Sequence, residues 1–284
     1  MFVVLDVLSH FFDALRQNRN LNFRRTNVSF VTSDLGNSLV LILFCYHSFF
    51  IIPHLLKIIK NYGKIPLMED QIILVDKPAG ISSFGIVAKI RRELKEEFGH
   101  KIKVGHTGTL DPFATGLLIL LSGKMTKKSN EFLKLDKIYE AELKLGFVSS
   151  TGDPEGEIQP FHIEGASDPC PKRKTVESVL RSFTGKITQT PPRFSAIKIN
   201  GERAYKLARK GADFEIPSRE VEIYSIEILD YSYPTLKIRC HVSSGTYIRT
   251  LAEDIGKKLG TGAYLTALRR TKIGQYSVTD AIKL

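Results

Sequence analysis

GHTGTLDPFATG, residues 105–116, is the most informative segment of this 284-residue chain. Its glycines let the backbone approach a ligand closely, and its small polar residues can hydrogen-bond a phosphate or the edge of a base. Asp111 precedes Pro112, which biases the aspartate towards an extended conformation that could present its carboxylate outward. The same letters are also typical of an ordinary turn with an Asp-Pro corner, and spacing alone leaves both interpretations open.

Regular structure is predicted on both sides of this segment. Apolar or alternating runs predict strands over residues 72–75, 117–121, 137–145 and 236–242, and helical spacing predicts helices over about 84–98, 176–183 (capped by Thr175), 204–210 and 247–259. Asn200-Gly201 is a hairpin signal. This mixture indicates an α+β domain with a central, largely antiparallel mixed sheet flanked by helices and loops.

The overall charge favours a polyanionic partner. The chain has 41 basic and 30 acidic side chains, a net charge of +11 and a pI near 9.5. Each phosphate that such a surface neutralises releases condensed counterions. Cys45, Cys170 and Cys240 lie far apart and form neither a disulfide framework nor a zinc knuckle, a usage that fits a reducing cytoplasm.

Residues 1–67 differ from the rest of the chain. Residues 36–56 carry no charge, and a membrane-spanning helix needs about 20 apolar residues. Pro53, two histidines and basic residues on both sides count against a span, so membrane association is not favoured. A misplaced start codon, a disordered, membrane-associated or partner-binding leader and a globular extension stay open. Because Met68 precedes the first predicted strand, we expect function to reside in residues 68–284.

A series of motifs carries a specific resemblance. They are Lys77-Pro78-Ala79-Gly80 with Ser82-Ser83, the segment 105–116, DKIY at 136–139, QTPPRFSAIK at 189–198, SSGTYIR at 243–249 and Leu268-Arg269-Arg270. Over about residues 72–282 the chain resembles the bacterial tRNA pseudouridine-55 synthases of the TruB type, in their short form without a C-terminal PUA domain. The resemblance implies the pseudouridine synthase fold and an isomerase that acts on one uridine of the tRNA T-loop.

The implied reaction needs no redox step and no group donor. The N1–C1′ bond of uridine breaks, the uracil turns, and C5 bonds to the same sugar carbon, so neither a cofactor nor a metal is expected. The resemblance implies that Asp111 is the nucleophile, that Arg249 pairs with it, and that Tyr139 stacks on the target base. Whether Asp111 attacks C1′, attacks C6 or helps to remove a sugar proton stays open.

Further residues are implied to contact the RNA. His106 would fill the space left by a flipped base, Lys77 and Tyr247 would line or support the pocket, and Leu268 would pack under the base. Residues 189–211 correspond to an RNA-gripping insertion. Its Lys206, Arg209 and Lys210 suit phosphates, and Arg269-Arg270 would extend that footprint.

Plainer interpretations accompany these roles. Tyr139 could be a core residue, His106 a loop histidine, and Arg249 a surface arginine. As a whole the chain could modify another RNA, or be a non-catalytic RNA-binding or tRNA-folding protein. Having Asp111, Tyr139 and Arg249 together favours catalysis, by a cytoplasmic monomer that needs no guide RNA.

Overall fold

The computed structural model describes residues 28–35, 38–45, 68–161, 170–199 and 201–284 of the chain. It divides into two units, Met1–Pro66 and Leu67–Leu284. In the first unit, β1 (Val28–Leu35) and β2 (Ser38–Cys45) form an antiparallel hairpin. The apolar run at 39–52 therefore begins as a strand rather than a helix, and its remainder lies outside the described residues. Within the described ranges, no helix is long and apolar enough to cross a membrane.

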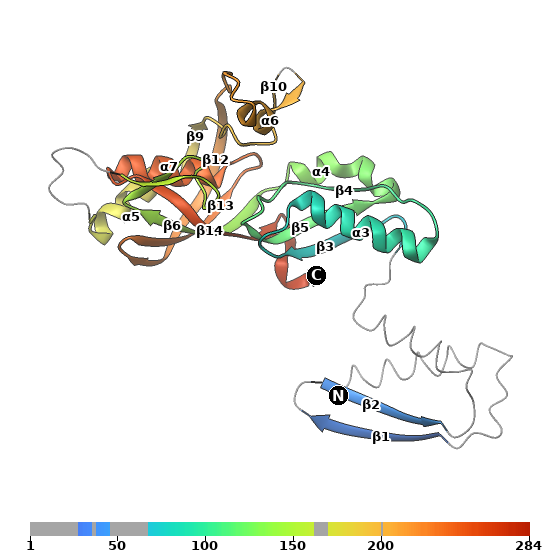
Figure 1. Cartoon of the computed structure of the whole chain (residues 1–284). Helices are drawn as coiled ribbons and strands as arrows, with labels where there is room; N and C mark the ends of the chain where they lie inside the picture. The colour runs from blue at the N-terminus through green and yellow to red at the C-terminus, as the bar shows by residue number, and fades with distance from the viewer. Residues whose placement is uncertain (1–27, 36–37, 46–67, 162–169, 200) are drawn as a thin grey trace. The chain divides into compact units, whose positions relative to one another are not determined.

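The second unit is built on a mixed sheet, in which the described strands follow the order β16-β3-β5-β14-β6-β13-β12-β9 (Figure 1). Their bounds are β3 (Ile72–Lys77), β5 (Thr115–Ser122), β6 (Lys137–Leu145), β9 (Gly185–Gln189), β12 (Arg219–Ser232), β13 (Thr235–Val242), β14 (Ala263–Ile273) and β16 (Ile282–Lys283). β4 (Val104–His106) pairs with β5, and β15 (Tyr276–Ser277) with β14. Among these described strands the β14–β5 and β16–β3 pairs are parallel and the others antiparallel, which confirms the predicted class.

Capping residues mark both ends of one long helix and the end of another. α3 (Ser83–Phe98) starts after Ser82, whose hydroxyl accepts the backbone N–H of Gly85 at 3.1 Å, and ends at the left-handed Gly99. α7 (Ile248–Leu259) ends in the same way at Gly260. Both helices bury one apolar face against the sheet, which fixes the residues at their first turns relative to the strands.

The remaining helices and strands are short, and one of them begins earlier than predicted. They are α4 (Ser129–Leu133), α5 (Arg173–Arg181), α6 (Ala204–Arg209), the 3-10 helices η1 (Gly123–Lys128) and η2 (Val278–Asp280), and the short strands β7 (Phe147–Ser149), β8 (Ile158–Pro160), β10 (Lys198–Ile199) and β11 (Glu202–Arg203). Thr175 does not cap α5. The N–H of Val176 already bonds the carbonyl of Lys172 at 3.1 Å, so the helix begins three residues earlier than predicted and Thr175 lies in its first turn.

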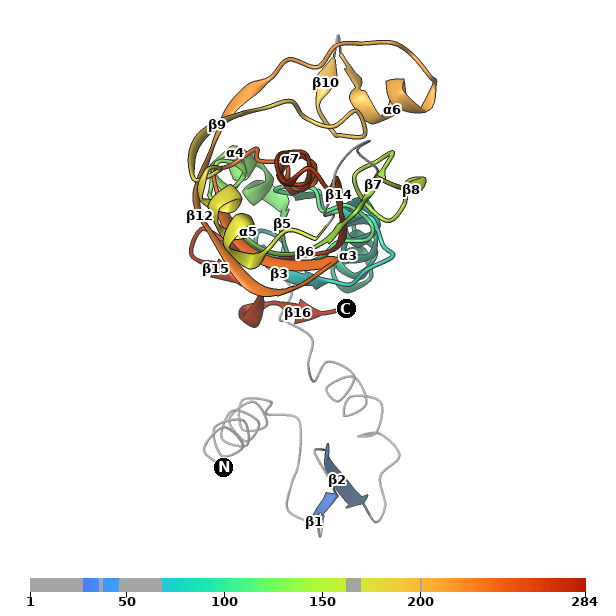
Figure 2. The ribbon, with the colours of Figure 1, turned by 90° about the vertical axis from the view of Figure 1, so that its left-hand side faces the viewer.

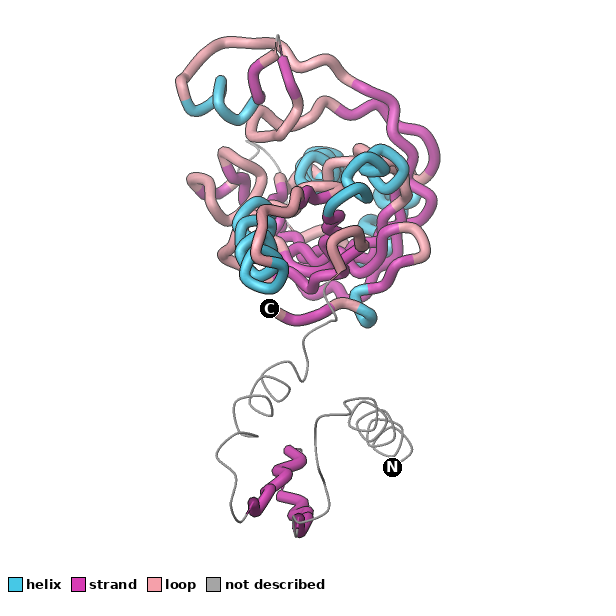
Figure 3. The backbone as a smooth tube through the Cα atoms, turned by 90° about the vertical axis from the view of Figure 1, so that its right-hand side faces the viewer, coloured by secondary structure: helices cyan, strands magenta, loops and turns pink. Residues whose placement is uncertain are grey.

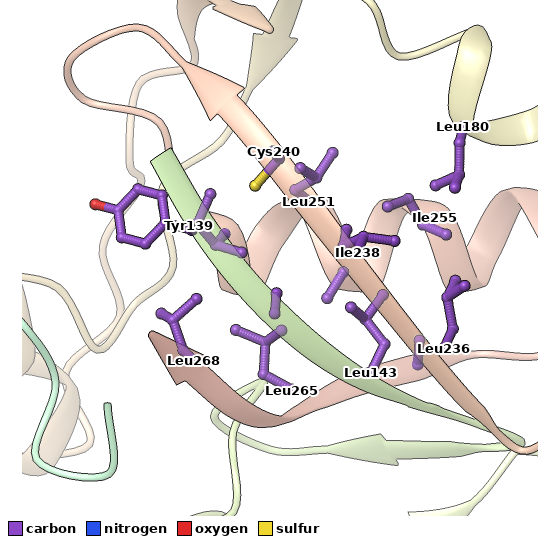
Figure 4. Close-up of a cluster of buried hydrophobic side chains, with 14 of the residues drawn as sticks. Tyr139, Leu143, Leu180, Leu236, Ile238, Cys240, Leu251, Ile255, Leu265 and Leu268 are labelled. Carbon is purple, nitrogen blue, oxygen red and sulfur yellow. The ribbon is translucent and has the colours of Figure 1, made fainter. Parts of the chain in front are cut away.

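The main core lies where β6, β13 and β14 pack against α5 and α7 (Figure 4). β5 is different, because all its residues after Thr115 are buried, as expected of a strand covered on both faces. At its start, Gly116 has φ +103°, and an added Cβ would lie 2.3 Å from the carbonyl oxygen of Arg270. The glycine therefore permits the close approach of β14, and this brings two motif segments together.

The predicted insertion stands apart from this core. β9 leads into it and β12 leads out of it, and between them β10, β11 and α6 project beyond the sheet (Figures 2 and 3). The β10–β11 hairpin turns at positions 200 and 201, where the Asn-Gly pair predicts it; Asn200 itself lies outside the described residues. Tyr205 N–H bonds the carbonyl of Ser195 at 3.0 Å, which ties α6 to the incoming segment.

Candidate active site

Asp111 lies in the loop between β4 and β5, and both of its neighbours are fixed. The Leu110 N–H donates to the hydroxyl of Ser83 over 2.8 Å, and that hydroxyl donates back to the Leu110 carbonyl over the same distance. On the other side, the Pro112 carbonyl accepts the N–H of Gly80 at 2.9 Å. The carboxylate is therefore presented by a loop that is bonded to the start of α3 and to the turn before it.

Arg249, in the first turn of α7, meets this carboxylate with two nitrogens. Its Nε lies 3.0 Å from Oδ2 of Asp111, and its Nη2 lies 3.4 Å from Oδ1. The guanidinium side chain is 6 % exposed, whereas that of Asp111 is 31 % exposed. The pair is thus buried on the arginine side and open on the aspartate side, which leaves the carboxylate accessible to a ligand.

The same guanidinium also binds a second carboxylate and two carbonyls. Its Nη1 lies 3.2 Å from Oδ2 of Asp153 and donates to the carbonyl of Thr151 at 3.0 Å, and its Nη2 donates to the carbonyl of Phe194 at 2.8 Å. Asp153 is held in turn by the Thr151 hydroxyl, at 2.6 Å. Arg249 therefore joins the Asp111 loop, the β7–β8 turn and the insertion at one charged group.

Opposing effects set the ionisation of Asp111. Burial raises the pKa of the Asp111 carboxyl, and the nearby Asp153 carboxylate adds to this increase. The positive charges of Arg249 and Lys77 oppose the rise in that pKa, and Arg249 is the stronger of the two. The net direction is upward, so the group takes up a proton at a higher pH than an ordinary aspartate.

The Lys77 side chain is fully buried beside this loop. Its Nζ donates to the carbonyls of Pro78, Ile81 and Pro112 at 2.8, 2.7 and 3.1 Å. Burial lowers the pKa of Lys77 to about 8, against the opposing charge of Asp111. The ammonium group therefore ties the turn after β3 to the residue that follows Asp111.

An apolar floor lies next to the carboxylate. Tyr139 of β6, Leu268 of β14 and Leu110 belong to one buried cluster, with 8, 7 and 3 % of their surfaces exposed. Figure 4 shows Tyr139 and Leu268 at one end of the cluster, with the tyrosine hydroxyl pointing away from the aliphatic side chains. A flat base could rest against such a surface, beside a charged group.

Arg270 is a charged residue that the sequence analysis assigned wrongly. It is 1 % exposed, so it is a buried structural residue and not a surface phosphate contact. Its Nε donates to the Leu117 carbonyl at 2.8 Å, its Nη2 donates to the Gly108 carbonyl at 3.1 Å, and its guanidinium lies 6.0 Å from the centre of the Tyr139 ring. It thereby fixes the loop to the floor. The sequence Leu268-Arg269-Arg270 gave no indication that the Arg270 side chain is buried.

His106 stands at the end of β4, partly buried. Its Nδ1 accepts the N–H of Gly108 at 3.4 Å. Burial lowers the pKa of His106, and the positive charges of Arg270 and Arg203 lower it further. The lowered pKa favours the neutral form of the ring at pH 7.

Two family models match consecutive parts of the chain. Residues 92–248 match the TruB family pseudouridylate synthase N-terminal domain, and residues 249–284 match the tRNA pseudouridylate synthase B C-terminal domain. The chain is 45 % identical over 218 residues to tRNA pseudouridine synthase B of Phocaeicola vulgatus, covering 76 % of this chain and 91 % of that protein. The chain belongs to the TruB family of pseudouridylate synthases. The resemblance noted in the sequence is confirmed, and the protein is an enzyme, a pseudouridine synthase.

Other relatives and solved structures agree with this TruB assignment. The tRNA pseudouridine synthase B of Parabacteroides distasonis is 46 % identical over 213 residues, covering 73 % of this chain and 87 % of that protein. A chain from the crystal structure of a Cbf5-Nop10-Gar1 complex is 30 % identical with a TM-score of 0.56. That match covers 76 % of this chain and 52 % of the other, so the TruB-family chain spans about half of its length.

The other predicted RNA contacts of this TruB-family chain lie outside the Arg249 network. Tyr247 precedes α7, and its ring centre lies 4.9 Å from the guanidinium of Arg219. Arg269 forms two hydrogen bonds with Asp76, at 2.8 and 3.0 Å. Lys206 and Arg209 of α6 are exposed, and so is Lys210, which directly follows that helix.

The sequence analysis missed the Asp153 carboxylate. It lies in a glycine- and proline-rich turn that gave no periodic signal, although Ser149, Thr151 and Asp153 alternate there. For residues 68–161, 170–199 and 201–284, no group of three or more His, Cys, Asp and Glu side chains is arranged to hold a metal ion.

Proposed function

We propose that this protein isomerises the uridine at position 55, in the T-loop of tRNA, to pseudouridine, with Asp111 as the nucleophile. The observation that carries the proposal is the Asp111–Arg249 pair, a carboxylate held through both oxygens and exposed on one side only. The relatives named tRNA pseudouridine synthase B support tRNA as the substrate.

The reaction rearranges one nucleotide without adding or removing atoms. The N1–C1′ bond breaks, C5 bonds to C1′, the proton on C5 leaves, and N1 gains a proton. Attack of the Asp111 carboxylate on C1′ or C6 would give a covalent intermediate, which the later steps release. Either route needs an ionised carboxylate within reach of the nucleotide, and Arg249 favours that ionised form.

The residues around Asp111 would position the flipped nucleotide. The uridine must leave its stack, at a cost of a few kcal/mol, before Asp111 can reach it. The neutral His106 ring would occupy the vacated space. Leu268 would support the flipped uracil, while the Tyr139 ring would stack on it and its hydroxyl could transfer a proton.

The decisive test is the Asp111→Asn variant of the full chain with an unmodified tRNA transcript and no guide RNA. We expect the single-turnover rate to fall on the order of 10⁴-fold or more, because the amide keeps the shape and loses the nucleophile. tRNA affinity should stay within a few-fold of the wild type. Site-resolved pseudouridine mapping and filter binding measure the two quantities.

Asp254→Asn is the matched control, because it removes a partly exposed carboxylate of α7 that pairs with Lys257. It should leave the rate unchanged. Substantial turnover by the Asp111 variant would refute the nucleophile assignment. A wild-type protein that binds tRNA but forms no pseudouridine, or forms it only in another RNA, would refute the substrate assignment.

A further inference from the structure

A concave basic surface lies at the start of β4, whereas the loop that carries Asp111 follows the end of that strand. A hollow of about 600 Å³ is lined by Arg91, Arg92 and Lys95 of α3 and by Lys101, Ile102 and Lys103, which lead into β4. We call it the α3 basic pocket. Five of its six lining residues carry a positive charge, and none carries a negative one.

The three basic residues of α3 that line the pocket lie close together on the surface of the helix. At 100° per residue, Arg91, Arg92 and Lys95 fall within an arc of about 100° that faces the pocket. The acidic residues Glu93, Glu96 and Glu97 fall in an arc of similar width between the basic arc and the buried face. Lys89 lies among these acidic residues, so the signs are mixed there, as is usual for a solvated helix face. The arc that faces the pocket carries positive charge alone.

The pocket cations have few partners within the protein. In the described part of the chain, no ion pair joins any of the five to a carboxylate. Arg91 alone has a visible structural task, since its Nη2 donates to the Val104 carbonyl at 2.5 Å. The dipole of α3 favours a cation in its last turn, which accounts for Lys95 but not for Lys101 or Lys103.

A continuous set of contacts joins the pocket to the active-site loop. The guanidinium of Arg91 lies 5.6 Å from the ring centre of Phe84, which is 63 % exposed. Three residues earlier, the carbonyl of Ile81 accepts the same Lys77 ammonium that binds the Pro112 carbonyl. Lys103 is three residues before His106, at most about 10 Å along an extended chain. The pocket and the Asp111 loop are therefore connected through α3, the turn after β3 and β4.

We propose that the α3 basic pocket binds backbone phosphates of the same tRNA whose uridine enters the Asp111 site. The inference rests on the proposed function. Five cations from two chain segments suit a row of phosphates better than one small anion, and the exposed Phe84 ring beside them offers a surface for a base or sugar. RNA helices are recognised largely through their backbone, which requires no base-specific groups here.

The test uses two double variants of the full chain, Arg92→Gln with Lys95→Gln, and Lys101→Gln with Lys103→Gln. Each removes two positive charges from one wall and leaves Arg91 in place. We expect the tRNA Kd to rise about tenfold at 0.1 M salt, and the slope of log K against log salt to flatten by about 1.5. The single-turnover rate at saturating tRNA should match the wild type, because no pocket residue contacts Asp111.

Lys257→Gln with Lys258→Gln is the control, an equal loss of charge at the end of α7. It should leave affinity and slope unchanged, and melting temperatures should show that all variants are folded. The inference is overturned if both pocket variants keep the wild-type Kd and slope, or if the control loses as much affinity as they do. If the wild type makes no pseudouridine in tRNA while the pocket variants still lose affinity, the proposed function is refuted, and the role of the pocket in binding tRNA is retained.

Discussion

Positive charge serves this molecule in two different ways, at Arg249 and on α6 of the insertion. The Arg249 side chain is 6 % exposed and contacts the carboxylates of Asp111 and Asp153. Lys206 and Arg209 are exposed on a short helix that projects from the sheet (Figure 2). Charges interact strongly where water is excluded and weakly where water and salt screen them. Substitution of the buried Arg249 alone should therefore have a large effect, whereas each exposed cation should contribute a small effect that adds to the others.

Of the variants that compare the two regions, Arg249→Ala is expected to have the largest effect. Removing the guanidinium leaves two carboxylates facing each other in a poorly hydrated site, so the pKa of Asp111, already raised by burial, should rise further. We expect the single-turnover rate at pH 7 to fall about 10²–10³-fold. The free energy of unfolding should drop by about 3–5 kcal/mol, as for other broken buried ion pairs.

Arg239→Ala is the matched control for this prediction. Arg239 pairs with Glu140 at 2.8 Å, but both side chains are more than one-third exposed. Its loss should leave the rate unchanged and cost less than about 1 kcal/mol in urea unfolding. Similar losses for the two arginines, in either rate or stability, would remove the distinction between buried and exposed charge.

The two regions also differ in how far the sequence predicts them. Periodicity and caps predicted α3, α7 and the Asn-Gly hairpin, because these signals are local. Family motifs implied that Arg249 pairs with Asp111, 138 residues away, and the structure places them 3.0 Å apart. Asp153 and the inward-pointing Arg270 were missed, since each depends on a partner brought by the tertiary fold. The assigned catalytic roles stay predictions.

A smaller effect, with a specific direction, is expected from Asp153→Asn. The Asp153 carboxylate raises the pKa of Asp111, so its replacement by a neutral amide should lower that pKa. Because turnover needs ionised Asp111, the acid limb of the rate–pH profile should move to lower pH. The rate at neutral pH should fall about tenfold, since Arg249 would lose its ion pair with Asp153 and keep only Asp111 and the carbonyls of Thr151 and Phe194 as partners.

The matched control is again Asp254→Asn, whose wild-type carboxylate pairs with Lys257 across 3.9 Å. Its acid limb should coincide with that of the wild type in single-turnover rates measured between about pH 4.5 and 8. An acid limb that stays in place in the Asp153 variant, or moves to higher pH, would show that this carboxylate does not act on Asp111 through its charge.

The smallest effect is expected from the exposed side of the comparison, the double variant Lys206→Gln with Arg209→Gln. If these cations meet tRNA phosphates, the Kd should rise a few-fold at 0.1 M salt and the slope against log salt should flatten by about 1.5. The rate at saturating tRNA should stay unchanged. Lys210→Gln offers a control at the residue that follows the same helix, because Glu202 already pairs with that ammonium group at 2.7 Å and should leave it less effective towards RNA. A larger loss of affinity for the Lys210 variant, or a slower chemical step in the double variant, would mean that α6 acts by shaping the insertion and not by the sum of its charges.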